Sequence, residues 1–168
     1  MKFLELAKKR NSIRGYKKKP IEDEKLKEIL EAAQMAPTGA NRQAFQLIVV
    51  HTSSKKEEEL RAIYKADWFL TAPVFICACA TETEGQPFRE AGAHLNVAIA
   101  VDHLVMAATD LGMGTCWIGA YDRDAVRKIL GIPDNVHPVI LVTVGYPDAE
   151  PRPKTRKTIE ELVHYERW

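Results

Sequence analysis

The sequence predicts a single α+β domain, on three observations. Three short apolar runs, Phe45–Val50, Val74–Ala80 and Val139–Val144, have the length and composition of buried strands. Between and around them lie segments with the apolar spacing of amphipathic helices. The 168 residues contain no repeat, linker or low-complexity segment at which the chain would divide into two domains.

Five helices are expected from apolar spacing and from helix-start signals. Leu26, Ile29 and Ala33 recur on one helix face, and Ser54 and Glu57 form a capping box. The expected ranges are Lys2–Lys9, with Phe3, Leu6 and Ala7 turned inward, Asp23–Met35, Ser54–Tyr64, Arg89–Leu111 and Asp122–Leu130. A fourth, shorter strand is expected over Thr115–Ile118. Val74–Ala80 is almost continuously apolar, so this strand is expected to be buried on both faces.

The longest expected helix, Arg89–Leu111, is rich in small and apolar residues. A helix that is apolar on most sides is buried on most sides, which in so small a chain predicts contact with a partner subunit. His94, Asn96 and Asp102 on this helix need hydrogen-bond partners. We expect these partners across the subunit interface; the alternative is that one of the side chains lies beside a substrate. The tail, residues 148–168, carries little core and is expected to pack on the partner subunit.

Composition narrows the classes of function. The net charge is +1, with 46% apolar and 28% charged residues, which favours neither nucleic acid nor a membrane as a partner. No signal peptide is expected, and no apolar run is judged long enough to span a membrane. Cys77, Cys79 and Cys116 are interpreted as reduced, buried thiols of a cytoplasmic protein.

Several familiar motifs are missing from the sequence. Gly112-Met113-Gly114 lacks the third glycine of a dinucleotide fingerprint and follows a helix instead of opening one. The five histidines show no zinc-binding spacing, so no metal is expected. Cys116 lies in an apolar strand and is interpreted as a structural thiol, with a nucleophilic cysteine as the alternative.

The stretch Arg10-Asn11-Ser12-Ile13-Arg14 has the chemistry of a phosphate site. In an extended segment alternate side chains point the same way, so Arg10, Ser12 and Arg14 share a face and Asn11 and Ile13 turn away. Two guanidiniums and a hydroxyl suit phosphate oxygens, because arginine donates to them in pairs. The alternative is a solvated basic turn. Basic residues also concentrate near the C-terminus, at 152–157, and the two clusters could converge on one anion.

Four segments together resemble the nitroreductase family of flavin mononucleotide (FMN) enzymes. They are Arg10–Arg14, Ala36–Gln43, Leu111–Gly119, and Val144–Pro147 followed by Arg156. The resemblance covers essentially the whole chain. It implies a nitroreductase-like fold, with a central, mostly antiparallel sheet flanked by helices, in an interlocked homodimer with two FMN sites at the subunit interface.

The resemblance also implies which residues bind FMN. The residues that match the ligands of the phosphate and ribityl chain are Arg10, Asn11, Ser12, Arg14, Lys154 and Arg156. The residues that match a loop lent by the partner subunit to the flavin ring are Pro37, Thr38, Gly39 and Asn41. The residues that match the strand end beside the ring are Trp117, Ile118 and Gly119, with the Gly119 backbone N–H facing the flavin N5. Because the hydride chemistry belongs to the flavin, no catalytic side chain is expected.

Three features depart from the family pattern. Asn11 stands where the family usually has a second arginine, and Ala44-Phe45 stand where it usually has proline and tryptophan. Neither change removes an expected phosphate ligand. The segment Glu82–Pro87 leaves little room for the helical lid of larger members, so an open, permissive site is expected.

The leading hypothesis is an FMN-dependent oxidoreductase that takes hydride from NADH or NADPH. It would pass the hydride, by ping-pong chemistry, to a nitroaromatic, a quinone or a similar small, flat acceptor. One alternative is a flavin-binding or flavin-handling protein with little NAD(P)H-dependent turnover. Another is a structural dimer that has lost flavin, against which the presence of Arg10, Ser12, Arg14 and Arg156 speaks.

Overall fold

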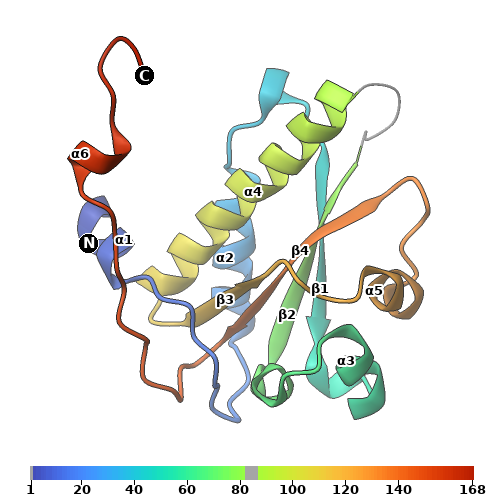
Figure 1. The fold of residues 1–168 in the computed structure, drawn as a ribbon. Helices are drawn as coiled ribbons and strands as arrows, with labels where there is room; N and C mark the ends of the chain where they lie inside the picture. Colours follow the sequence, from blue (N-terminus) through green and yellow to red (C-terminus); the bar gives the residue numbers. More distant parts are fainter. Residues whose placement is uncertain (1, 82–86) are drawn as a thin grey trace.

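A four-stranded antiparallel sheet lies at the centre of the computed structural model, which describes residues 2–81 and 87–168 (Figure 1). The strands are β1 (Phe45–His51), β2 (Val74–Ala80), β3 (Gly114–Ile118) and β4 (His137–Gly145), in the order β1-β2-β4-β3. Each neighbouring pair is antiparallel. The α+β fold with a mostly antiparallel sheet is therefore confirmed.

Helices cover both faces of this sheet. They are α1 (Phe3–Lys9), α2 (Asp23–Gln34), α3 (Glu57–Ile63), α4 (Pro87–Asp110), α5 (Arg123–Leu130) and α6 (Ile159–Leu162), with 3-10 turns η1 (Gly39–Asn41), η2 (Thr52–Ser54) and η3 (Asp67–Thr71). One core cluster joins α2 and α4 to the sheet and includes Ile29 and Val101. A second cluster, around Phe69 and Phe75, lies beneath α3 and α5. Figure 1 shows α4 crossing the sheet as its longest covering element.

Strand β2 is buried on both faces along its whole length, as its apolar composition predicts. Ile76 and Ala78 belong to the cluster beneath α2 and α4. Cys77 and Cys79 belong to the opposite cluster. All three cysteines are free and buried.

The start of α3 differs from the predicted capping box of Ser54 and Glu57, which was wrong. The helix begins at Glu57, and the backbone N–H of Lys56 donates to the carboxylate of Glu59 (2.8 Å). The Ser54 hydroxyl instead donates to the carbonyl of His51 (2.7 Å), because Ser54 belongs to the preceding turn η2. The cap predicted at Asp122 is confirmed, since its carboxylate accepts from the Ala125 N–H (2.8 Å).

Helix α4 corrects the expectation that no apolar segment is long enough to span a membrane. Its segment Ala91–Asp110 spans 20 residues at a mean hydropathy of 1.3, which is long and apolar enough to cross a membrane by length and composition. The helix is apolar because it is the central helix of the core, where Val97, Val101 and Leu104 are fully buried. One side remains uncovered by the chain itself, since Leu95 is 64% exposed and Ile99 37% exposed.

The C-terminal tail runs past helix α1 (Figure 1), where Lys154 donates to the carbonyls of Lys8 and Arg10. Both segments have exposed apolar side chains. Phe3, predicted to turn inward, is 73% exposed, while Leu6 and Ala7 are half-buried. Every residue from 151 to 168 is exposed. The expectation about a missing lid concerns residues 82–86, which lie outside the described part of the chain.

Candidate functional site

A cavity of about 280 Å³ lies between the N-terminal segment and the C-terminal tail. We call it the basic cavity; its lining residues are Arg10, Asn11, Ser12, Arg14, Arg152, Pro153, Lys154, Thr155 and Arg156. All six residues predicted to hold the phosphate and ribityl chain line it. The structure therefore brings the two basic clusters of the sequence together at one place.

The first half of the cavity is held in position by the edge of the sheet. Ser12 forms a parallel bridge with Thr115 of β3, and the Ile13 N–H donates to the Thr115 carbonyl (2.8 Å). Ile13 is buried in a small cluster with Tyr16. The extended segment turns Ile13 inward as predicted. Asn11, expected to turn away with Ile13, borders both the basic cavity and a neighbouring hollow that Ile13 also lines.

Tyr16 anchors the end of this segment. Its hydroxyl donates to the Ile13 carbonyl (2.9 Å) and lies 2.7 Å from the hydroxyl of Thr143 on β4. Burial raises the pKa of Tyr16, so the phenol stays protonated and can donate. The guanidiniums of Arg10 and Arg14 are thus carried on backbone that is tied to two strands.

Lys154 closes the second half of the cavity. Its ammonium donates to the carbonyl of Arg10 (2.7 Å) and to the carbonyl of Lys8. Partial loss of solvent lowers the pKa of Lys154, and the positive charges of Arg10 and Arg156 lower it further. Cations that repel one another across a cavity are stabilised by an anion between them, and guanidinium and ammonium groups are the usual ligands of phosphate. These residues therefore fit a phosphate group.

Cys116 lies beneath the same site. Burial raises the pKa of its thiol, and the nearby Arg14, Ser12 and Arg10 only partly oppose this shift. A buried thiol with a raised pKa is mostly protonated at neutral pH and is a poor nucleophile. The structure thus favours the structural interpretation of Cys116 over the nucleophilic one.

The loop of Pro37, Thr38, Gly39 and Asn41 lies elsewhere in the chain. The Gly39 N–H donates to the side chain of Asn96 (3.1 Å), in the first half of α4, whereas the basic cavity adjoins the strand that follows the end of α4. About 20 Å of helix separates Asn96 from that end. A single chain therefore does not bring this loop to the basic cavity.

The backbone of this loop has positive φ angles and is held by hydrogen bonds to side chains. Ala40, Asn41 and Gln43 have φ angles of 52°, 51° and 53°, a region that non-glycine residues rarely adopt. The Thr38 hydroxyl accepts from the Gln43 N–H (3.0 Å) and the buried Asn96 holds Gly39. Asn96 was expected to bond across a subunit interface; its side-chain oxygen instead bonds within its own chain.

Trp117, Ile118 and Gly119 form the end of edge strand β3. Ile118 is buried against the α3 and α5 side, and Trp117 is half-buried against the α4 side. Gly119 is exposed, and a Cβ added there would meet no atom within 4 Å. Packing within the chain does not require glycine at this position, which leaves room for a ligand to approach the backbone.

The sequence analysis did not predict three residues of the basic cavity, Arg152, Pro153 and Thr155. The concentration of basic residues at 152–157 was the available signal for Arg152. Thr155 carries no such signal, because a lone hydroxyl in a polar tail has no distinguishing pattern.

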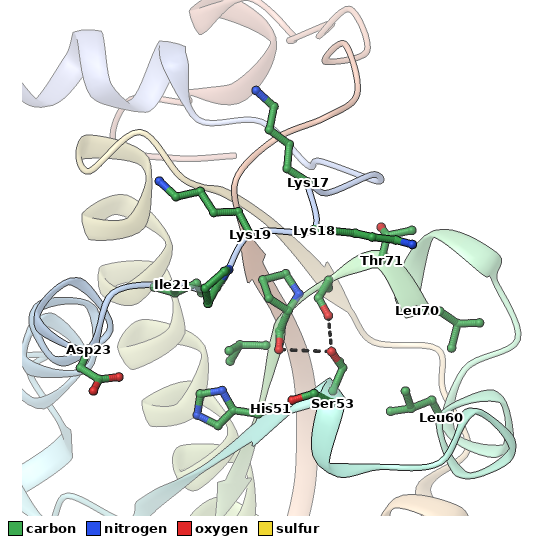
Figure 2. A pocket seen from close by; sticks show the side chains of 15 residues that line it. Lys17, Lys18, Lys19, Ile21, Asp23, His51, Ser53, Leu60, Leu70 and Thr71 are labelled. Atoms are coloured by element: carbon green, nitrogen blue, oxygen red, sulfur yellow. Dashed lines mark hydrogen bonds between the residues drawn. The ribbon is translucent and has the colours of Figure 1, made fainter.

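A larger cavity of about 520 Å³ lies where β1 ends and β2 begins, beside Lys17, Lys18 and Lys19 (Figure 2). Figure 2 shows Lys17 and Lys19 extending away from His51 and Ser53. The hydroxyl of Thr71 donates to the Trp68 carbonyl (2.7 Å) and accepts from the Tyr16 N–H (3.1 Å). The Thr71 hydroxyl is thus engaged in the framework, and Lys17 and Lys19 do not converge on one point of this cavity.

Comparisons with known proteins point to the family that the four sequence segments resemble. The sequence profile of the Nitroreductase family matches residues 7–66 and 63–146. A solved nitroreductase family protein from Clostridium difficile is 34% identical, with a TM-score of 0.85 and coverage of 100% of both chains.

Two curated relatives extend the comparison. A protein of Archaeoglobus fulgidus, provisionally named an NADH dehydrogenase/NAD(P)H nitroreductase, is 32% identical over 145 residues, or 84% of this chain and 83% of the relative. A Bacillus subtilis protein named FMN reductase [NAD(P)H] is 29% identical over 174 residues, or 92% of this chain and 70% of the relative.

Proposed function

The chain belongs to the nitroreductase family, and on this premise we propose that it is an FMN-dependent oxidoreductase. It would take hydride from NADH or NADPH and pass it by ping-pong chemistry to a nitroaromatic, a quinone or a similar flat acceptor. The names of the relatives from Archaeoglobus fulgidus and Bacillus subtilis support a nicotinamide nucleotide as donor and FMN as cofactor.

The observation that carries this proposal is the basic cavity. Arg10, Ser12 and Arg14 from one end of the chain and Lys154 and Arg156 from the other line one hollow. A phosphate monoester carries nearly two negative charges at neutral pH, so several converging donors suit it better than one. The resemblance assigns these positions to the FMN phosphate, and their convergence supports that assignment.

The other residues would position the ring and the substrates. When bound, FMN supplies hydride transfer between the nicotinamide and the acceptor. The half-buried Trp117 would offer an apolar wall, the buried Ile118 would fix the backbone of the strand end, and the exposed backbone of Gly119 would approach the ring at N5. No side-chain acid or base is invoked, because water can supply the proton of the reduced product.

A homodimer would complete the site. Leu95 and Ile99 on α4 and the apolar side chains of the tail are exposed in the single chain. A partner subunit covering them would bring its own Pro37–Asn41 loop to the flavin ring, which this chain's loop does not reach at the basic cavity. The three free, buried cysteines fit a reducing compartment, so we place the protein in the cytoplasm.

The test is the absorption spectrum of the purified protein, followed by anaerobic addition of NADH and then NADPH. Flavin bands that bleach with either nucleotide, and return when a quinone is added, are the expected result. Flavin bands that neither nucleotide bleaches would favour the flavin-handling alternative. A protein that binds no FMN even after reconstitution would overturn both.

A further inference from the structure

A third cavity, of about 380 Å³, lies where α4, α5 and β4 meet. We call it the α5 cavity; the residues that matter are His94 from α4, Arg123, Asp124 and Arg127 from α5, and His137 from β4. Its volume is in the range of sites that hold small organic ligands. None of these residues belongs to the basic cavity or to the predicted FMN ligands.

The cavity exists because β3 is shorter than its neighbour. The last β3 residue, Ile118, pairs with Leu141, whereas β4 begins at His137. The first residues of β4 therefore extend past the end of β3, and the chain turns through Gly119 into α5. The Arg123 guanidinium donates to the Gly119 carbonyl (3.4 Å), so the α5 cavity adjoins the strand end assigned to the flavin ring.

The charges around the cavity are mostly positive. Two guanidiniums, two imidazoles and the carboxylate of Asp124 line it, and the rings of His94 and His137 have centroids 6.5 Å apart. The Asp134 carboxylate, outside the lining, lies 4.0 Å from the Arg127 guanidinium. Each neutral imidazole can donate one N–H, and protonation adds a second donor. This donor set matches an oxyanion better than a neutral or cationic group.

The two arginines have different tasks. Arg127 donates to the carbonyls of Pro133 (2.5 Å) and Ile132 (3.4 Å) and so holds the loop after α5. Arg123 is exposed; its guanidinium carbon lies 5.1 Å from the centre of the Tyr121 ring, and among the side chains that the structure describes its one hydrogen bond is the long contact to Gly119. A guanidinium has five N–H donors, so most of those on Arg123 remain free for a ligand.

We propose that the α5 cavity binds the oxyanion group, carboxylate or phosphate, of a substrate whose reacting part lies at the flavin ring, with Arg123 as its principal ligand. The proposal rests on the proposed function, because it needs the ring beside Gly119. If the bound group is a carboxylate, the α5 cavity selects anionic aromatic acceptors over neutral ones. It selects the dinucleotide donor if the group is a phosphate.

Binding is tested first, without turnover. The oxidised FMN-loaded protein is titrated with benzoate and with benzamide, following the flavin spectrum and the histidine imidazole NMR signals. We expect the benzoate Kd to rise about tenfold in Arg123→Gln, as for one lost charge-assisted hydrogen bond, and the benzamide Kd to stay constant. Arg123→Lys should retain part of the affinity, and Lys128→Gln, on the same helix but outside the cavity, should match the wild type.

Kinetics then separates the two sources of the oxyanion. If the acceptor carries it, the ratio of kcat/KM for para-nitrobenzoate to that for nitrobenzene falls about tenfold in Arg123→Gln. If the dinucleotide carries it, the rate constant for anaerobic reduction of the flavin by NADH or NADPH, divided by the Kd of the dinucleotide, falls in Arg123→Gln instead. Equal effects of Arg123→Gln and Lys128→Gln in all these measurements would overturn the proposal.

The same experiments distinguish failure of the proposed function. A wild-type protein that is not reduced by NADH or NADPH contradicts the proposed function. The titration of the histidine signals with benzoate still decides whether the α5 cavity takes an oxyanion. Benzoate that shifts neither His94 nor His137 at any concentration below the solubility limit contradicts the further inference alone.

Discussion

The ammonium of Lys154 donates a hydrogen bond of 2.7 Å to the carbonyl of Arg10, although 144 residues separate them in the chain. This contact joins the C-terminal tail to the extended segment that carries two of the arginines of the basic cavity. Because the tail is otherwise exposed, the contact is one of few that fix it to its own chain. The basic cavity is therefore assembled from segments near the two ends of the chain.

Replacing Arg14 by Ala should weaken FMN binding about 10- to 100-fold, since a charge-assisted hydrogen bond to phosphate is lost. The Kd is measured by fluorescence titration of FMN into the apoprotein. Arg14 is exposed at the cavity, so the melting temperature of the apoprotein should not change. Lys128→Ala removes a cation from exposed surface on α5 and serves as the control; equal Kd values for both variants would contradict the phosphate assignment.

Replacing Gly114 in β3 by alanine should destabilise the protein, whereas replacing Gly119, just after β3, should not. A Cβ on Gly114 would lie 2.8 Å from the side chain of Ile13, so Gly114→Ala should lower the free energy of unfolding by about 1–3 kcal/mol. A Cβ on Gly119 meets no atom within 4 Å, so Gly119→Ala should change stability by less than about 0.5 kcal/mol.

Flavin binding by the two glycine variants complements the measurement of their stability. Gly119→Ala should weaken FMN binding or slow the bleaching by nicotinamide nucleotide, because the added methyl group occupies space beside the ring. Denaturant unfolding and FMN titration are carried out on both variants. A Gly119→Ala protein with wild-type flavin properties would argue against placing Gly119 beside the flavin.

Leu95→Glu should convert a dimer into a monomer. Leu95 is 64% exposed on the side of α4 that the chain leaves uncovered, and a buried carboxylate at an apolar interface is costly. Sedimentation of the wild type at micromolar concentration should give the dimer mass, and the variant should lose bound FMN together with its partner. Lys128→Glu introduces the same group on α5 and should remain dimeric; a wild-type monomer that holds FMN would refute the shared site.

Tyr146→Phe should return the pKa of Glu22 toward its ordinary value of 4.5. In the folded protein the Tyr146 hydroxyl donates to the Glu22 carboxylate (2.5 Å), and Lys19 adds a further favourable charge, which lowers this pKa to about 2. A carboxyl whose pKa is lowered by folding stabilises the protein above its ordinary pKa, and this contribution is lost as the pH falls from 4.5 to about 2.

The carboxyl carbon NMR signal of Glu22, followed against pH, measures this effect directly. The variant should titrate at higher pH than the wild type and should show a weaker pH dependence of its melting temperature below pH 4.5. Tyr165→Phe, in the exposed tail, is the matched control. Identical Glu22 titrations in wild type and Tyr146→Phe would show that the Tyr146 hydroxyl does not lower this pKa.

Much of the fold follows from local patterns along the chain. The strand at Val74–Ala80 and the helix at Asp23–Gln34 match their predicted ranges closely, because continuous apolar runs and helical spacing report burial directly. The cap at Asp122 is equally local. Ser54 was misassigned because several polar residues precede α3, and which of them caps the helix depends on the turn that precedes it.

The sequence by itself determined the four strands, helices α1 to α5 and the chemistry of the two basic segments, since residue type and spacing carry that information, whereas the four-residue helix α6 was not predicted. Only the tertiary structure decided that Lys154 bonds to the carbonyl of Arg10 and that the Asn96 side chain bonds to Gly39 of the same chain. It also decided that β4 extends beyond the end of β3, where the α5 cavity lies. These relationships depend on strand register and on the path of the chain between distant segments. Register and chain path are set by the packing of the whole core, so no local pattern records them.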